Sequence, residues 1–404
     1  MTTHPFISFP PNLGELPSRV WLLLGEIQAR IDHIKKLPIP RDESSSLRRM
    51  YLTKGVHSTT AIEGNSFSEE EVGRIIEGKL KAPPSREYQQ QQIDNMVDAF
   101  NTVAKTLLSG SSTPFSLDLL NSYHKIVLNK LNDSLANEVV IGELRTHRVM
   151  VGRYLAAPPE DCARLINMYC DWLNQDMPAP DGYEIAVQIV KALVAHVYFA
   201  WIHPYGDGNG RMTRLIEFVI LLQAGVPDVA AHLLSNFYNK TRDQYYAHLQ
   251  SSHGEYRDGS YPEKSNLHGF IGYALQGFKD ELDEQFSIIH AIQVRIIWHD
   301  YIHAEFRKRY SENLSPSRQR QKCLILDLTV HRFDEPVTKE QIRDVTTALY
   351  LAYAEKNKRM IQRDLNVLVD MELLIHDGTG YKPNTDILLA FFAKTRVEPE
   401  QTAN

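Results

Sequence analysis

The chain has 404 residues, of which 43% are hydrophobic, and it carries a formal net charge of −6 at pH 7. A chain of this length is expected to fold into two or three domains with sizeable hydrophobic cores. Its weakly acidic balance excludes an overall electrostatic attraction to nucleic acids or anionic membranes.

The cysteines and the N-terminus bear on the cellular compartment. Cys162, Cys170 and Cys323 lack zinc-site spacing and are odd in number, which argues against a disulfide framework. Met1–Glu15 has no basic segment followed by an apolar core, and we find no apolar run long enough to cross a bilayer. We therefore predict a cytoplasmic protein that has no membrane partner.

Residues 1–110 are predicted to form an N-terminal helical region. Apolar residues recur at helical spacing over Val20–Ile34, from Asp42 toward Thr60, and over Gln89–Leu108. Ser68 and Glu71 form a capping box for a further short helix.

Residues 111–280 are predicted to form a second, mostly helical domain. Helical spacing continues over Ser116–Leu128, Asp161–Leu173 and Glu184–Ile202. The last of these segments is apolar almost all round, which is typical of a central helix. Between them, Gly142–Pro159 alternates enough to predict a short β-hairpin.

Polar residues and glycines concentrate in the loop that follows Ile202. Gly206, Gly208 and Gly210 let backbone N–H groups approach a ligand, at the start of a helix that favours an anion. Arg211 and Arg214 lie three residues apart, so both can reach one polyphosphate.

Two further side chains give this loop its chemistry. Asp207 is an oxygen ligand suited to Mg²⁺, and His203 can accept a proton near neutral pH. The stretch from His203 to Arg214 is therefore predicted to be a phosphate site with a base beside it.

The rest of the chain is predicted to contain a long helix and a small domain. Helical spacing runs from Leu267 to about Phe306, and residues 281–314 are taken as a linker helix. Residues 315–395 contain three predicted helices and a turn suited to a β-wing, as in a winged helix-turn-helix. These helices are Leu324–Leu328, Ile342–Val345 and Met360–Leu374. Residues 396–404 form a tail.

The loop from His203 has the sequence His-Pro-Tyr-Gly-Asp-Gly-Asn-Gly-Arg-Met-Thr-Arg. It resembles the signature of the Fic family, in which Phe usually stands at the position of Tyr205. The resemblance implies a mainly α fold with a Fic-type helical core and a short β-hairpin flap, to which the C-terminal winged helix is added.

The resemblance also implies an activity and its residues. Fic proteins of this kind are protein adenylyltransferases, which transfer AMP from ATP to a Ser, Thr or Tyr hydroxyl of a target protein. His203 would be the catalytic base, and Asp207 would hold Mg²⁺. The nucleotide would be bound by Gly206, Asp207, Gly208, Asn209, Gly210, Arg211 and Arg214.

A second motif lies near the end of the predicted helix at Thr60. Thr59 and Glu63 occupy the defining places of Ser/Thr-x-x-x-Glu-Gly/Asn, which is similar to the inhibitory motif of many Fic proteins. The similarity implies that Glu63 pairs with Arg214 and keeps the γ-phosphate of ATP from binding productively. A carboxylate and a phosphate then compete for one guanidinium group.

Two further stretches resemble parts of the same family. Gly-x-x-Arg-x-x-x-Val-x-x-Gly, from Gly142 to Gly152, is similar to the flap that aligns a target peptide by strand addition. This similarity implies that Val151, Gly152, Arg153 and Tyr154 lie over the nucleotide or the target, whereas a purely structural hairpin is the alternative. Arg-x-x-Tyr-Tyr-x-x-Leu, from Arg242, implies that Tyr245 and Tyr246 line the adenine and ribose side.

Two other functions stay open at this stage. Glu63 could orient a water molecule so that the protein removes AMP from a modified target. Alternatively, the core could sense ATP for a DNA-binding regulator, with Lys356, Lys358, Arg359 and Arg363 meeting phosphates. The segment from Ser315 to Thr395 has twelve Lys or Arg and eleven Asp or Glu, however. This balance favours protein docking or a homodimer over DNA binding.

Overall fold

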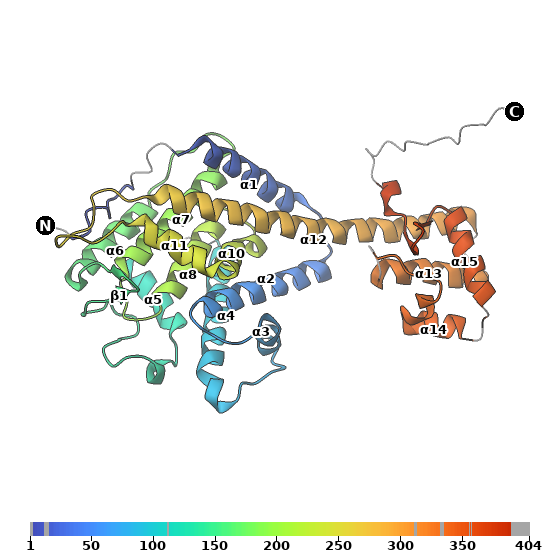
Figure 1. The fold of residues 1–404 in the computed structure, drawn as a ribbon, viewed down its shortest axis with the longest axis horizontal. Coiled ribbons are helices and arrows are strands. Elements are labelled where there is room, and N and C mark those ends of the chain that lie inside the picture. Colours follow the sequence, from blue (N-terminus) through green and yellow to red (C-terminus); the bar gives the residue numbers. More distant parts are fainter. Residues whose placement is uncertain are drawn as a thin grey trace. The chain divides into compact units, whose positions relative to one another are not determined.

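A computed structural model describes residues 3–11, 16–110, 113–310, 313–331, 335–354, 356 and 358–388. The chain is mainly helical, as predicted, and divides into two compact units, Met1–Phe286 and Ser287–Asn404 (Figure 1). The predicted boundary between residues 110 and 111 falls inside the first unit. The predicted tail, residues 396–404, lies outside the described residues.

The first unit contains eleven complete helices among its described residues, together with the start of a twelfth. They are α1 Ser18–Lys36, α2 Arg41–Ile62, α3 Glu69–Ile76, α4 Glu87–Leu108, α5 Leu117–Val127, α6 Pro159–Leu173, α7 Glu184–Ile202, α8 Asn209–Gln223, α9 Asp228–Ala231, α10 Leu233–Lys240, α11 Arg242–Ser252 and α12 Leu267–Arg309. Short 3₁₀ turns cover Pro84–Arg86 and Asn132–Ser134. The predicted capping box is confirmed, because the Ser68 and Glu71 side chains each accept a hydrogen bond from the other residue's backbone N–H.

Helices α7 and α8 form the centre of the first unit. They pack against each other, and α1, α4, α5 and α6 surround them (Figure 1). Helix α7 is long and apolar enough to cross a membrane by length and composition, which the sequence prediction overlooked. Since 89% of this stretch is buried inside the protein, its apolar surface forms core.

Helix α2 crosses the same unit and brings its C-terminal end to α8. It packs along α10 and also contacts α3, α4 and α8. The close approach depends on Gly55, because a Cβ at this position would lie 2.3 Å from Nδ1 of His232. The helix ends at Ile62, and Gly64 follows with φ +92°, a conformation that favours glycine.

The predicted β-hairpin is present between α5 and α6. Strand β1 (Met150–Val151) pairs antiparallel with β2 (Tyr154–Leu155), with Val151 opposite Tyr154. Gly152 adopts φ +59° in the connecting turn. The hairpin therefore projects from the unit as a two-stranded element beside α7.

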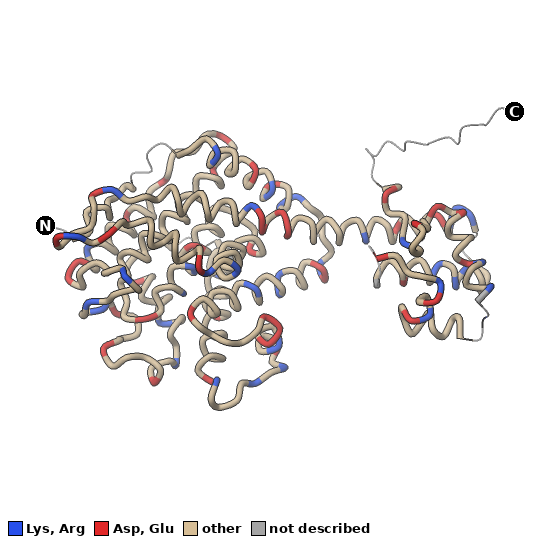
Figure 2. The backbone as a smooth tube through the Cα atoms, viewed as in Figure 1, with Lys and Arg blue, Asp and Glu red and all other residues tan. Residues whose placement is uncertain are grey.

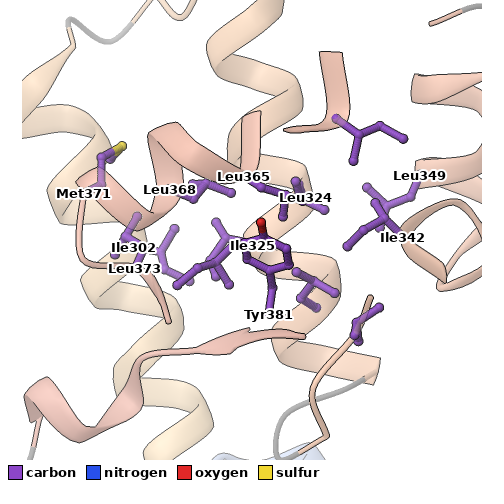
Figure 3. Close-up of a cluster of buried hydrophobic side chains, with 14 of the residues drawn as sticks. Ile302, Leu324, Ile325, Ile342, Leu349, Leu365, Leu368, Met371, Leu373 and Tyr381 are labelled. Atoms are coloured by element: carbon purple, nitrogen blue, oxygen red, sulfur yellow. The ribbon is translucent and has the colours of Figure 1, made fainter. Parts of the chain in front are cut away.

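The second unit consists of residues 287–309 of α12, three further helices and a second hairpin. The helices are α13 Pro316–His331, α14 Thr347–Tyr353 and α15 Lys358–Asp370, and the hairpin pairs β3 Leu374–His376 with β4 Tyr381–Pro383. Short 3₁₀ turns cover Gln341–Asp344 and Thr385–Leu388. Leucine, isoleucine and aromatic side chains from α12, α13, α15 and the hairpin form one buried cluster (Figure 3).

Two helix predictions in this unit were wrong in their bounds. The segment Ile342–Val345 lies in and just after a 3₁₀ turn, and α14 starts later because the Thr346 hydroxyl caps it by accepting from Leu349 N–H at 3.0 Å. Helix α15 stops at Asp370 instead of reaching Leu374, because Glu372 has φ +59° and Leu374 begins β3. Three helices are therefore followed by a hairpin, and the winged-helix assignment stays a prediction.

Candidate active site

A cavity of about 360 Å³ lies where α2, α7, α8, α11 and the β1–β2 hairpin meet. Residues from all of the predicted motifs line it. They are Glu63 from α2's end, Val151–Tyr154 from the hairpin, Ala200, Trp201 and His203 from α7's end, Asn209, Gly210, Thr213 and Arg214 from α8, and Tyr245, Tyr246, Leu249, Gln250 and His253 from α11 and its end. The fold thus brings together segments that are about 190 residues apart in the sequence.

His203 sits directly after α7 in a left-handed conformation, with φ 49° and ψ 60°. Its Nδ1 lies 3.4 Å from the carbonyl of Ala200, which favours a proton on Nδ1 and leaves the Nε2 lone pair free to accept one. Burial lowers the pKa of His203 to about 4. The imidazole is therefore neutral at pH 7, the state that a general base requires.

The start of α8 provides backbone donors next to His203. The first backbone bond of the helix runs from Met212 N–H to Gly208 O at 2.9 Å, so the N–H groups of Asn209, Gly210 and Arg211 have no acceptor within the helix. Gly208 takes φ +75°, which glycine adopts without strain. This end of α8 has the geometry of an anion site.

Arg211 and Arg214 lie beside these donors and have unused hydrogen-bonding capacity. Their side chains are only 5% and 1% exposed, respectively. Among the described residues, Nε and Nη1 of Arg211 and Nη1 of Arg214 have no hydrogen-bond partner. Buried guanidinium donors without acceptors are costly, so an anionic ligand would stabilise this arrangement.

Glu63 contacts Arg214, as the inhibitory motif predicts. Arg214 Nη2 donates to Glu63 Oε1 at 2.5 Å and to the Thr59 carbonyl at 3.0 Å, and Nε donates to the Thr59 hydroxyl at 2.8 Å. The Glu63 carboxylate also lies over Gly210, because a Cβ there would be 2.1 Å from Oε1. The carboxylate therefore occupies space directly above the start of α8.

The pKa of Glu63 reflects this contact. Burial by itself would raise the pKa, but the charge and hydrogen bond of Arg214, together with the charge of Arg211, lower it overall. Glu63 is thus ionised at neutral pH. Its side chain is still 32% exposed, which places it at the mouth of the cavity.

Asn209 and Asp207 have structural contacts that the sequence analysis did not foresee. The Asn209 amide is 3% exposed and bonds both backbone groups of Tyr205, accepting from its N–H at 3.0 Å and donating to its carbonyl at 2.7 Å. Asp207 Oδ1 accepts from Arg211 Nη2 at 3.0 Å and from Gly208 N–H. The side chain of Asp207 is 45% exposed. Gly206, Asp207, Gly208 and Arg211 frame the loop and are not among the residues that line the cavity.

Tyr205 packs beneath the loop on residues that were not predicted to support it. Its ring stacks on His124 with centroids 3.8 Å apart, and its hydroxyl donates to Asn121 Oδ1 at 2.9 Å. His124 Nδ1 accepts from Gly142 N–H, so its Nε2–H donates to the Asp207 carbonyl at 3.0 Å. His124 therefore holds the loop from α5, and no sequence spacing links α5 to position 205.

The two tyrosines of α11 differ in their surroundings. Tyr245 is 3% exposed, and its hydroxyl lies 2.9 Å from His196 Nε2. Tyr246 is 41% exposed, and its hydroxyl donates to the Ile62 carbonyl at 3.4 Å. Together with His253, they line the cavity, and both tyrosines lie near enough to Arg214 for its charge to act on their pKa values.

The hairpin lines the cavity, and the described residues occupy the outer edge of its strand β2. Tyr154 is buried and donates its hydroxyl hydrogen to the Trp201 carbonyl at 2.8 Å. The backbone of Leu155 in β2 already bonds the Tyr261 hydroxyl and His4 Nε2, each at 2.8 Å. Strand β1 keeps Met150 and Val151 exposed, so a further strand could add on its side.

Comparison with known proteins agrees with this geometry. Residues 114–221 match the model of the Fic/DOC family, a range that includes the loop from His203 to Arg214. The chain is 28% identical over 239 residues to Protein adenylyltransferase Fic of Nematostella vectensis, covering 58% of this chain and 51% of that protein. It is 31% identical over 210 residues to Protein adenylyltransferase fic-1 of Caenorhabditis elegans, covering 51% and 38%. The chain thus spans 51% and 38% of the lengths of these two curated relatives.

Solved structures of Fic proteins share the fold. A Fic family protein from Desulfovibrio desulfuricans superposes with a TM-score of 0.55 at 18% identity, covering 90% of this chain and 93% of that one. Residues 134–508 of Fic-1 from C. elegans superpose with a TM-score of 0.53 at 23% identity, covering 68% and 73%. The mainly helical, Fic-type fold predicted from the sequence is therefore confirmed.

Proposed function

Because the chain carries a Fic domain, we propose that it is a protein adenylyltransferase that moves AMP from ATP to a side-chain hydroxyl of a target protein. One observation carries this proposal. A neutral histidine, the open start of α8 and the buried Arg214, which has an unused donor, lie around one cavity, and the buried Arg211 lies three residues before Arg214 on α8. This combination can hold a polyphosphate and accept a proton beside it.

The nucleotide is proposed to bind with its phosphates at α8. The N–H groups of Asn209 and Gly210 would meet the α- and β-phosphates. Arg211 and Arg214 would neutralise the polyphosphate tail. Tyr245 and Tyr246 would lie along the ribose and adenine. The Asn209 amide is occupied by the Tyr205 backbone, so its role here is to shape the loop.

Asp207 fits the proposed role of Mg²⁺ ligand. Its carboxylate is exposed enough to reach a cation, and its Oδ1 alone accounts for its hydrogen bonds to Arg211 and Gly208. Among the described residues, no three histidine, cysteine or acidic side chains gather to hold a metal. That suits Mg²⁺, which commonly binds through one or two carboxylates and substrate phosphates. When bound, Mg²⁺ would neutralise charge on the phosphates.

His203 is proposed to act as the general base. Its Nε2 takes the proton from the target hydroxyl while that oxygen bonds to the α-phosphorus, and pyrophosphate leaves. Positioning and charge stabilisation supply most of the rate in phosphoryl-transfer chemistry, and a base contributes about 10²- to 10⁴-fold. The target is proposed to add as a strand to β1, the open edge of the hairpin.

Glu63 is proposed to hold the enzyme in an inhibited state. Its carboxylate bonds Arg214 and lies over Gly210, where it competes with the nucleotide's terminal phosphate. ATP binding in a productive geometry then requires the carboxylate to leave the guanidinium group.

The experiment uses α-labelled ATP, the Glu63→Gly protein and a lysate as the source of targets. Label is expected on protein, and mass spectrometry should identify AMP on a Ser, Thr or Tyr side chain. Adding His203→Ala should abolish the label. Retained transfer by the double variant would contradict the role of His203.

A second activity is favoured by one feature of the site. The ionised Glu63 carboxylate lies at the mouth of the cavity, where it could orient a water molecule for removal of AMP from a modified target. Wild-type protein should then release AMP from a target that has been modified beforehand, and the Glu63→Gly protein should not. Equal release by both would exclude this use of Glu63.

The second unit contributes no residue to the proposed reaction. Basic and acidic residues are interspersed along its backbone (Figure 2), and Arg320 forms a 2.7 Å ion pair with the buried Asp364. We therefore propose a docking or homodimer role over DNA binding, in a cytoplasmic protein.

A further inference from the structure

Arg145 connects the end of α7 to both sides of the β1–β2 hairpin. It belongs to the segment before β1, and its side chain is buried, with the residue 4% exposed. Its position in the predicted flap motif gave no indication of what it contacts. In the structure it bonds the His203 carbonyl and is not among the residues that line the cavity.

All hydrogen bonds of the Arg145 side chain run to backbone carbonyls. Nε donates to the His203 carbonyl at 2.7 Å, and Nη2 donates to the Ile202 carbonyl at 3.4 Å. Nη1 donates to the His147 carbonyl at 2.7 Å, and Nη2 also donates to that of Ala157. The Arg145 backbone N–H adds a bond to the Pro204 carbonyl at 2.9 Å.

These contacts satisfy groups that the end of a helix leaves unpaired. The last carbonyls of an α-helix have no partner within the helix, and a cation near them is stabilised by the helix dipole. Three of the acceptors are the consecutive carbonyls of Ile202, His203 and Pro204. His203 has φ 49°, which is unfavourable for a residue with a Cβ and persists only where surrounding contacts impose it.

The other two acceptors flank the hairpin. His147 precedes β1 and Ala157 follows β2, so one guanidinium group joins both strands' outer ends to the catalytic helix. A lysine at this place would carry the charge but could not reproduce the planar, forked set of donors.

We infer that Arg145 is a positioning residue that fixes the backbone of His203 and ties it to the hairpin over the cavity. This inference rests on the proposed adenylyl transfer, in which the hairpin would align the hydroxyl that His203 deprotonates. Removal of the fork would let His203 and the target move relative to each other. Misplacement by about 1 Å costs roughly 10²-fold in rate.

The test compares Arg145→Lys and Arg145→Ala in the full chain carrying Glu63→Gly. Measured quantities are kcat and KM for AMP transfer, the Kd for ATP, and thermal unfolding. The expected result is a kcat reduced by about 10²-fold with Kd for ATP changed by less than about threefold, because ATP binds to α8 and α11. Guanidinium chloride at millimolar concentration, against sodium chloride as control, should restore part of the kcat of Arg145→Ala.

Arg148 supplies the matched control, since it is an exposed arginine three residues away on the same segment. Arg148→Ala should leave kcat unchanged. If Arg145→Ala does not fold, kcat and the Kd for ATP are compared between Arg145→Lys and the parent. An unchanged kcat in Arg145→Lys would overturn the inference, and so would equal losses in kcat and ATP binding.

A second readout separates this inference from the proposed function. Burial lowers the pKa of His203, and the nearby charge of Arg145 contributes to lowering it. Titration of His203 by NMR in protein labelled at histidine should show that its midpoint is higher in Arg145→Ala than in the Glu63→Gly parent. If the Glu63→Gly parent transferred no AMP, the proposed function would fail, and an unchanged midpoint in Arg145→Ala would independently overturn the positioning role.

Discussion

Replacing Glu63 by glycine should activate the enzyme, and the contact with Arg214 sets the size of the effect. The pair is joined by one charged hydrogen bond of 2.5 Å. A hydrogen bond to a charged group contributes about 1.5–3 kcal/mol. Because the Glu63 side chain is 32% exposed, solvent screening places it at the lower end, about 1.5 kcal/mol. That is about tenfold in an equilibrium constant.

The expected result is therefore a Kd for ATP that is lower by about tenfold and AMP transfer that is higher by at least this factor. Titration calorimetry measures the first quantity, and transfer from α-labelled ATP measures the second. Glu63→Gln, which keeps a hydrogen-bond acceptor without the charge, should lie between wild type and Glu63→Gly. Glu70→Gln, a change at an exposed glutamate of α3, serves as the control.

The same change should destabilise the protein without nucleotide. Arg214 is 1% exposed and would lose its countercharge, which is costly for a buried cation. Thermal unfolding should therefore show a lower Tm for Glu63→Gly, and ATP should narrow the difference from wild type because its phosphates replace the carboxylate. If Kd, transfer rate and Tm all stay at wild-type values, the competition between Glu63 and phosphate is refuted.

Further predictions follow from the supporting residues and the histidines. Tyr205→Phe should lower the free energy of unfolding by about 1 kcal/mol, measured by urea denaturation, because it removes only the hydrogen bond to Asn121. AMP transfer should stay unchanged, and a lower rate of transfer in this variant would show that the hydroxyl acts in the reaction. The acid side of the kcat/KM profile of Glu63→Gly should have its midpoint well below 6.5, because burial lowers the pKa of His203 and the variant lacks the Glu63 charge that raises it, and a midpoint near 6.5 would contradict a desolvated base. His124 and His203 have folded pKa values of about 4 against 6.5 when unfolded, so the unfolded chain binds more protons between these values. The free energy of unfolding should hold above pH 6.5 and fall below it, by up to about 1.4 kcal/mol per pH unit for each histidine, and a flat profile from pH 7.5 to 5 would contradict this.

Local features of the fold were predictable because their causes lie within a few residues. Ser68 and Glu71 cap α3 through bonds that span three residues, and Gly152 permits the turn between β1 and β2. The stretch Glu184–Ile202 is apolar almost all round, which favours a central buried helix, although its length and composition alone would also suit a membrane span. The bounds of α14 and α15 were missed because a single capping hydroxyl and a single left-handed residue decided them.

The active-site motif could be predicted from the sequence, whereas the residues that hold its loop in place could not. Glycines, arginines and a histidine within twelve residues point to their chemistry by type and spacing alone. Arg145 and His124 act on that loop from 58 and 83 residues away, through backbone carbonyls that accept from any donor of the right shape. A carbonyl carries no side-chain identity, so the sequence holds no pattern that pairs it with its donor.

Asn209 shows how one residue type can serve two roles that only geometry separates. An amide next to a phosphate site could donate to the ligand, but it could equally close a loop because it has both a donor and an acceptor. Here both are used by the backbone of Tyr205, within four residues in the chain. A phosphate contact at this position, as proposed, would therefore come from the backbone N–H. Arg211 and Arg214 have buried donors that the described residues do not satisfy, which supports the proposal that they bind the phosphates.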